Sequence, residues 1–155
     1  MKVAIIGGGA AGFFAAISAK TNYPDAEVII FEKSAKTLAK VKISGGGRCN
    51  VTNATYKIGD IVKHYPRGEK QLRKTFSQFM TSDTVEWFES RGVPLVTQED
   101  LCIFPKAQDS QVIIDTLMTE VDRLGILVRI QSPIQSIDRL NEGFNLHIKD
   151  KPTYT

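Results

Sequence analysis

The amino-acid sequence predicts an α/β protein of the doubly wound class, built on a parallel sheet. Three observations carry this prediction. The short apolar run Val3–Ile6 ends in three glycines, good helix formers follow from residue 10 to about residue 22, and a second apolar run covers Glu27–Phe31. Strand, glycine turn, helix and strand within about 30 residues are typical of a βαβ unit, whose crossover is right-handed.

The first three elements follow from local patterns. Val3–Ile6 is almost continuously apolar, which is typical of a strand buried on both faces in a parallel sheet. The helix carries Phe13 and Ile17 one turn apart, and Tyr23-Pro24-Asp25 ends it because proline cannot continue a helix. Glu27–Phe31 then supplies the second strand.

The middle of the chain is predicted to be mostly helical, as an excursion over residues 54–109. Residues 72–80 have a helical pattern. A second helix ends at Gly92, and the spacing of Asp83 and Glu86 indicates a capped start. These helices are expected to leave the sheet before the chain returns to it.

The last third returns to the sheet. Ser110 can cap a helix whose apolar face ends at Gly125, and residues 126–130 are predicted to form a third parallel strand. Residues 134–138 and 144–148 alternate with period two around a Glu-Gly turn, which predicts an antiparallel hairpin. The expected fold is therefore an incomplete Rossmann-like domain with three parallel strands, a helical middle segment and a C-terminal β-hairpin.

The composition limits the classes of function. With 42% hydrophobic and 24% charged residues, the chain has the balance of a globular domain. No apolar run approaches the roughly 20 residues of a membrane helix, so we expect no membrane partner and a cytoplasmic location. Cys49 and Cys102 form no disulfide framework or zinc-ligand spacing, and His64 and His147 lack metal-ligand spacing, so no metal site is expected.

Positive charge is concentrated in one stretch. The chain has a net charge of +3, but residues 33–74 hold 11 Lys and Arg against two acids, a local charge of +9 that leaves −6 on the other 113 residues. Such a block attracts polyanions, among them a phosphate-rich cofactor, RNA or an acidic partner. A solvated basic surface without a partner is equally compatible with the charge alone.

The first glycine motif, Gly7-x-Gly9-x-x-Gly12, stands directly after a strand and opens a helix. In this pattern the first glycine permits the tight turn, the second lets the backbone approach a pyrophosphate, and the third allows close helix–strand packing. Glu32, at the end of the second strand, is the expected acceptor for the ribose hydroxyls of an adenosine. An acid there disfavours a 2′-phosphate, so the motif favours FAD or NAD over NADP.

The second motif is the segment Ser44–Asn53, with three consecutive glycines and closely spaced hydrogen-bonding side chains. Its glycines expose backbone N–H groups, so the segment can wrap an anionic or polar ligand. The alternative is a flexible hydrophilic loop. Cys49 within it is either a small residue that packs beside the ligand or, less favoured by the absence of a partner cysteine, a reactive thiol.

The two motifs together resemble those of the bacterial BaiN-type NAD(P)/FAD-dependent flavoproteins. Gly7–Gly12 reads GGGAAG and Ser44–Asn53 reads SGGGRCNVTN, as in that family. Residues 87–94 and the Phe104-Pro105 pair are also similar, so the resemblance covers essentially the whole chain. It implies the N-terminal part of an FAD-binding domain of the glutathione-reductase type, over residues 1–155, without the substrate domain and the C-terminal return segment.

The resemblance also implies a set of cofactor-binding residues. Gly7, Gly9, Ala10, Ala11 and Gly12 would hold the pyrophosphate, Glu32 the ribose, and Lys33 with the backbone at Ile134 the adenine; Lys40, Ser44, Gly45, Gly46, Gly47, Arg48, Cys49 and Asn50 would run along FAD towards the flavin. Leu38 departs from the family, where a glycine is expected before the Lys40 segment. No catalytic acid or base is assigned.

Three functions stay open on the sequence. The first is a flavin-dependent oxidoreductase that reduces a C=C bond in a small molecule or an RNA uridine, with NAD(P)H as candidate electron donor. The second is a non-catalytic, truncated nucleotide-binding module. The third is an RNA-binding module that uses the basic stretch. A sheet of three parallel strands should also expose an edge, through which the chain can self-associate.

Overall fold

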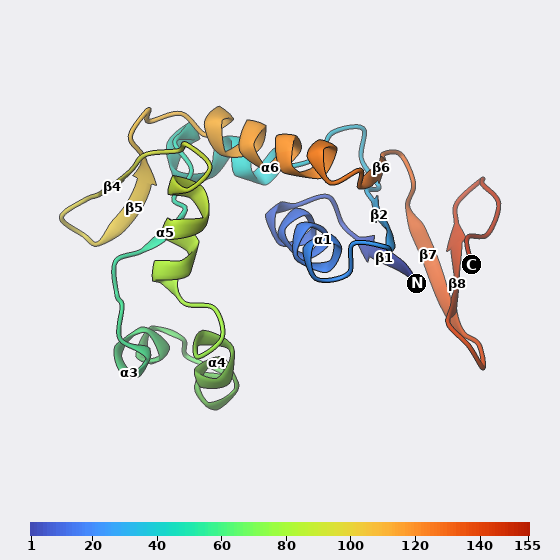
Figure 1. Ribbon diagram of the computed structural model, residues 1–155, viewed down its shortest axis with the longest axis horizontal. Helices are drawn as coiled ribbons and strands as arrows, with labels where there is room; N and C mark the ends of the chain where they lie inside the picture. The colour runs from blue at the N-terminus through green and yellow to red at the C-terminus, as the bar shows by residue number, and fades with distance from the viewer. The chain divides into compact units, whose positions relative to one another are not determined.

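The computed structural model describes all 155 residues and divides into two compact units (Figure 1). The first unit contains residues 1–40 and 117–155, and the second contains residues 41–116. The two helices that cross the boundaries are α2 (Ala39–Ile43) and α6 (Gln111–Arg123). None of the helices combines the length and the apolar composition needed to cross a bilayer.

The first unit is built on the predicted parallel sheet. Its strands are β1 (Lys2–Ile6), β2 (Glu27–Phe31) and β6 (Leu127–Arg129), in the order β1-β2-β6, and both pairings are parallel. β2 is central, and its last four residues are buried. The predicted Rossmann-type arrangement of three parallel strands is therefore confirmed, with the C-terminal ends of all three strands at one edge of the sheet.

The expectation that the first strand is buried on both faces is wrong. β1 lies at the edge of the sheet, with β2 as its single neighbour, and none of its residues is fully buried. Ile6 is 51% exposed. An apolar run with β-branched residues indicates a strand but does not say whether the strand is central or lies at the edge of its sheet, where its side chains are less covered.

Helix α1 (Ala10–Asn22) packs against β1 and β2, and a glycine permits the close contact. A Cβ atom at Gly12 would stand 1.9 Å from the carbonyl oxygen of Gly7 and 3.4 Å from a methyl group of Ile5. The buried side of the helix carries Phe13, Ala16 and Ile17. Gly12 therefore has the packing role that the motif predicts.

The other face of the sheet is covered by the C-terminal hairpin. Strands β7 (Ile134–Arg139) and β8 (Phe144–Ile148) pair antiparallel and lie side by side in Figure 1. Leu146 and Ile148 pack against Ile29 and Phe31 of β2. Tyr154 extends this cover, because it forms a two-way backbone bridge with Leu146 and its ring lies 5.4 Å from that of Phe31. The predicted hairpin is confirmed.

The second unit combines short helices with a small sheet. Its helices are α3 (Ile58–Ile61), α4 (Glu69–Phe76) and α5 (Thr81–Glu89), with the 3₁₀ helices η1 (Ser44–Gly47) and η2 (Val62–His64). Strands β3 (Thr52–Asn53), β4 (Leu95–Thr97) and β5 (Cys102–Pro105) form an antiparallel sheet in the order β3-β5-β4. The sequence reading of a mostly helical excursion missed this sheet because two of its strands have only two or three residues.

Two predicted helix starts differ in their capping contacts. Asp83 is the third residue of α5, not its cap, and its carboxylate accepts a hydrogen bond from the backbone N–H of Met80. Ser110 precedes α6, but its hydroxyl donates to the carbonyl oxygen of Lys42 at 2.9 Å. The carboxylate of Asp109 accepts from the N–H of Gln111 instead. The Ser110 hydroxyl, which local spacing predicts to cap α6, thus bonds to a residue distant in sequence.

Leu38 confirms that the turn before α2 has the backbone of a glycine position. Its φ is 55°, in the left-handed region, and the residue is 1% exposed. A non-glycine residue with this φ costs about 1 kcal/mol or more. Its N–H donates to the carbonyl oxygen of Gly8 at 2.8 Å. The turn therefore forms despite the departure from the family pattern.

An apolar groove of about 830 Å³ runs along the free edge of β1. It is lined by β1, the hairpin and the last two residues, and it includes the exposed side chains of Ile137 and Phe144. An antiparallel pairing of β1 with β1 of a second copy, centred on Ala4, would place Lys2 opposite Ile6 and avoid a pair of like charges. The self-association that the sequence predicts would use this edge.

Replacing Phe144 by Thr should weaken this association. Phe144 is 56% exposed, so its loss removes apolar surface from the groove at little cost to the folded chain. Sedimentation velocity at increasing concentration should show wild-type association and less of it for Phe144→Thr. Val96→Thr, an exposed apolar residue of β4, is the matched control and should behave as wild type. A wild-type chain that stays monomeric at every concentration contradicts the expectation.

Gly12→Ala should destabilise the fold. The new methyl group would overlap the carbonyl oxygen of Gly7, so α1 must shift away from β1 at a cost of at least about 2 kcal/mol. Urea unfolding followed by circular dichroism measures the loss. Gly59→Ala is the control, because a Cβ there meets nothing within 4 Å. Equal stability of the two variants would mean that α1 does not depend on this contact.

Candidate functional site

The turn between β1 and α1 presents an uncapped helix start. Gly7 has a φ of 113° and donates its N–H to the carbonyl oxygen of Phe31 at 2.8 Å, which fixes the turn at the end of β2. Gly9 is the N-cap of the 13-residue helix α1, no side chain caps this end, and no acidic residue lies in the first turn. The N–H groups of the first turn and the positive end of the helix are therefore available to an anion.

The surface over this helix start is open. Gly9, Ala10 and Ala11 are exposed, and a Cβ atom at Gly9 would meet nothing within 4 Å. The free space in front of Gly9 is what the motif requires if a pyrophosphate is to approach its backbone. The absence of a side chain at Gly9 is therefore not explained by packing within the protein.

Gly8 is a structurally constrained position that the motif reasoning missed. It is buried, and a Cβ atom on it would stand 2.9 Å from Cβ of Glu32 and 2.9 Å from Cγ2 of Thr37. The signal for this crowding was a glycine in the middle of the run Gly7–Gly9, at a position that the Gly-x-Gly-x-x-Gly pattern treats as variable. Gly8 thus permits the contact between the first turn and the end of β2.

Glu32 makes that contact with its carboxylate. Oε2 accepts the N–H of Gly8 at 2.7 Å and Oε1 accepts the N–H of Ser34 at 2.7 Å. The hydrogen bond from Ser34 is the main cause that lowers the pKa of Glu32, with Gly8 and the charge of Lys33 acting in the same direction against desolvation. The carboxylate is therefore ionised at neutral pH, and both of its oxygens act only as hydrogen-bond acceptors.

The structure also brings the chain before Ile134 to this place. Ser132 donates its N–H to the carbonyl oxygen of Glu32 at 2.8 Å, and Gln131 donates to that of Ser34 at 3.0 Å. Ile134 begins β7 and is partly buried against the cluster that includes Phe31. The predicted residues of the first unit thus gather at the C-terminal edge of the parallel sheet, where ligands of open α/β sheets bind. Lys33 and Lys40 are exposed.

The second glycine segment, in the other unit, is held by contacts of its own. Gly45, Gly46 and Gly47 have φ of 56°, 69° and 87°. A Cβ atom at Gly45 would stand 2.8 Å from the ring of Phe104, and the N–H of Ser110 donates to the carbonyl oxygen of Gly47 at 2.8 Å. The segment is therefore a defined turn and not an unstructured loop.

Two predicted donors of this segment are already engaged inside it. The guanidinium of Arg48 lies 4.2 Å from the centre of the Phe104 ring, and its Nε donates to the carbonyl oxygen of Gly45 at 3.1 Å. The hydroxyl of Ser44 donates to the carbonyl oxygen of Val41 at 2.9 Å. Asn50 is exposed. Phe104 is a supporting residue that the analysis of the segment alone missed, because it lies more than 50 positions away.

Neither cysteine has the environment of an activated thiol. Cys49 is buried with a φ of 64°, and burial raises its pKa. A hydrogen bond with Asp100 raises the pKa of Cys102. Because a raised pKa keeps a thiol protonated, the packing role of Cys49 is favoured over the reactive one. No group of three or more His, Cys, Asp or Glu side chains lies where it could hold a metal ion.

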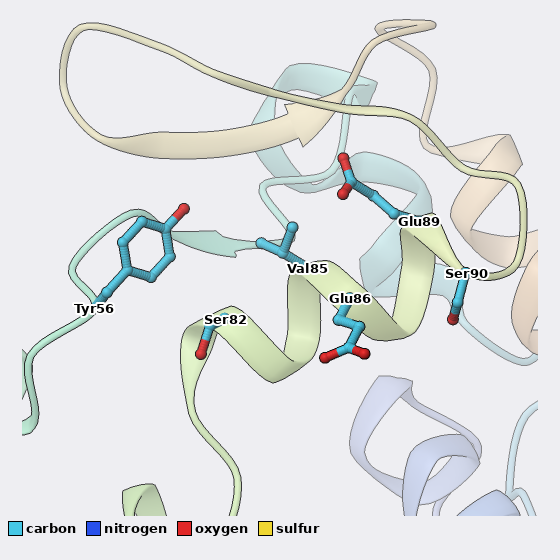
Figure 2. Close-up of a pocket in the computed structure, with 6 residues that line it drawn as sticks. All are labelled: Tyr56, Ser82, Val85, Glu86, Glu89 and Ser90. Atoms are coloured by element: carbon cyan, nitrogen blue, oxygen red, sulfur yellow. The ribbon is translucent and has the colours of Figure 1, made fainter.

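A separate hollow of about 330 Å³ lies along α5 (Figure 2). Tyr56 and one side of the helix line it, including Val85 and the two acids Glu86 and Glu89. Figure 2 shows the two carboxylates pointing away from each other. Without polar groups that converge on one point, the hollow does not have the chemistry of a binding site.

Comparison with known proteins places these features in a family. The model of the HI0933-like protein Rossmann domain matches residues 1–155. The chain is 28% identical over 143 residues to the 3-dehydro-bile acid delta(4,6)-reductase of Clostridium scindens, covering 92% of the chain and 34% of that protein. It is 29% identical over 149 residues to the ribosomal RNA dihydrouridine synthase of Escherichia coli, covering 93% of the chain and 34% of that protein. The chain spans about a third of the length of these curated relatives.

Solved structures show the same fold. The open conformation of a flavocytochrome c3 fumarate reductase superposes with a TM-score of 0.72 at 23% identity, over 99% of the chain and 31% of that protein. The 3-ketosteroid-delta4-(5alpha)-dehydrogenase of Rhodococcus jostii RHA1 superposes with a TM-score of 0.68 at 12% identity, over 96% of the chain and 42% of that protein. The match of the family model along the whole sequence confirms the family that the two glycine motifs predict, and the chain belongs to the HI0933-like protein Rossmann domain family.

Proposed function

We propose that the chain is the FAD-binding part of a flavin-dependent oxidoreductase. The observation that carries the proposal is the juxtaposition, in the first unit, of an uncapped helix start behind Gly9 with the ionised carboxylate of Glu32. The first suits a pyrophosphate, and the second suits the hydroxyls of an adenosine ribose. Both halves of an ADP group are thus provided for by adjacent turns.

The residues present fit FAD. The pyrophosphate would lie against Gly9, Ala10, Ala11 and Gly12, and Gly7 would shape the turn. The ribose would be held by Glu32. The adenine would be bordered by Lys33 and the backbone at Ile134. The assignment of Lys40 and of Ser44–Asn50 to the flavin side rests on the family resemblance. FAD, once bound, supplies hydride chemistry, and the protein binds and orients it. The negative charge of Glu32 opposes a 2′-phosphate, so NADP is disfavoured at this turn.

The names of the relatives support reduction of a C=C bond as the reaction of the intact protein. One relative is a delta(4,6)-reductase, and another is a dihydrouridine synthase, whose product is a uridine with a reduced C=C bond. We propose the same class of reaction, with NAD(P)H as electron donor and a cytoplasmic location. The alternative on the same site is a module that binds the nucleotide without turnover.

RNA is the alternative to a small molecule as the substrate, and the local charge of residues 33–74 supports it. Residues 33–74 carry a net charge of +9, and the Escherichia coli relative is named for ribosomal RNA. A phosphate backbone would be attracted to such a stretch. The FAD pyrophosphate is a competing target for the same charges.

Gly9→Ala should weaken FAD binding without unfolding the chain. The new methyl group meets no protein atom within 4 Å and the φ of −89° is allowed to alanine, but the group stands where the pyrophosphate must approach. Titration followed by quenching of flavin fluorescence should show saturable binding to wild type and at least about tenfold weaker binding to the variant. Gly59→Ala, on α3, should bind FAD as wild type does. A folded wild-type chain that does not bind FAD contradicts the proposal.

RNA binding, if the basic stretch serves it, should weaken steeply with salt. Fluorescence anisotropy of a labelled RNA fragment, measured over a series of salt concentrations, should give a linear fall of log affinity against log salt. The RNA titration is repeated with saturating FAD to test the competing target. Lysines and arginines that already contact the pyrophosphate cannot also bind RNA phosphates and release their counterions. Binding that is absent or insensitive to salt eliminates RNA as the partner of this segment.

A further inference from the structure

We propose that Glu32 is a positioning residue for the phosphate-binding turn, in addition to its contact with the ribose. Its carboxylate holds the backbone at Gly8 and Ser34 in place before any nucleotide arrives. The inference rests on the proposed nucleotide site and extends it, because a residue that served only the ribose would not be needed to shape the turn under the pyrophosphate.

The two oxygens of the carboxylate are divided between two turns. Oε2 accepts from Gly8, in the turn after β1, and Oε1 accepts from Ser34, in the turn after β2, both at 2.7 Å. Hydrogen bonds from backbone N–H groups to an ionised carboxylate are about twice as strong as neutral ones. One side chain therefore ties together the two loops that border the helix start. Each oxygen keeps a lone pair for a ribose hydroxyl.

Both backbone polar groups of Gly8 are hydrogen-bonded, and the space beside its Cα is filled. Its N–H is held by Glu32, its carbonyl oxygen accepts the N–H of Leu38 at 2.8 Å, and the absent side chain leaves room only for Glu32 and Thr37. Gly9 follows directly and begins α1. The orientation of the amides that face the pyrophosphate is thus set by the hydrogen bonds of Gly8.

Replacing Glu32 by Gln tests this role with little change of shape. A glutamine side chain has one acceptor oxygen and one NH₂ donor, so either Gly8 or Ser34 would face a donor and lose its partner. Glu27→Gln, at the start of β2, which Glu32 directly follows, is the matched control for charge. Glu27 accepts a long hydrogen bond from the Tyr154 hydroxyl at 3.3 Å, which an amide oxygen can still accept.

The experiment compares ligands with and without a ribose. Inorganic pyrophosphate and FAD are titrated into ¹⁵N-labelled wild type, Glu32→Gln and Glu27→Gln, and hydrogen exchange of the Gly8 and Ser34 amides is measured without ligand. We expect Glu32→Gln to bind pyrophosphate about tenfold more weakly and to exchange at least one of the two amides about tenfold faster. Glu27→Gln should match wild type in both.

The other outcomes separate this inference from the proposed function. If Glu32→Gln weakens FAD alone, with wild-type pyrophosphate binding and wild-type exchange, Glu32 serves only the ribose and the inference is overturned. If wild type binds neither ligand but exchange at Gly8 and Ser34 still depends on Glu32, the positioning role stands and the proposed function fails.

An acid titration of wild type keeps the inference testable if Glu32→Gln does not fold. The pKa of Glu32 is lowered in the folded chain, so the hydrogen bonds are intact above the ordinary pKa of about 4.3 and are lost as the pH falls through the lower folded value. Lys33 is the charged side chain that acts on this carboxyl. The amide shifts of Gly8 and Ser34 should move with the Glu32 carboxyl carbon at one midpoint. Amides that do not follow that carbon would refute the role.

Discussion

The close approach of Gly12 to the carbonyl oxygen of Gly7 is the constraint on which the first unit depends. Because no side chain separates them, α1 begins directly over the end of β1 and packs its buried face on β1 and β2. The helix start then lies at the same sheet edge as Glu32, which closes β2. The proposed nucleotide site is therefore formed by two short strands and the turns that follow them.

The two glycine segments solve different physical problems. The first leaves space and unpaired donors at Gly9, while its neighbour Gly8 is enclosed by Glu32 and Thr37. In the second, left-handed glycines allow the chain to wrap closely on Phe104, with Arg48 stacked over the same ring. The first leaves an open, uncapped helix start, and the second is held by contacts within the protein. A run of glycines alone does not distinguish these uses.

Sequence reasoning succeeded where one local pattern decides the structure. The βαβ start, the third strand and the hairpin follow from periodicity and turn chemistry, and the packing role of Gly12 follows from the spacing of the nucleotide motif. The ribose-binding role of Glu32 stays a prediction. It failed where partners are distant in sequence. The hydroxyl of Ser110 bonds to Lys42, 68 positions away, and not to its own helix. The exposure of β1 depends on which strands are its neighbours, and Gly8 on a contact with the next strand.

The central claim is that adjacent turns of the first unit receive the ADP half of FAD. A crystal structure of the chain with FAD tests it most directly. We expect pyrophosphate oxygens within hydrogen-bond distance of the N–H groups in the first turn of α1, and ribose hydroxyls on the Glu32 carboxylate, with the Gly8 and Ser34 contacts retained. A complex in which the pyrophosphate avoids the start of α1, or the ribose lies away from Glu32, would contradict the account.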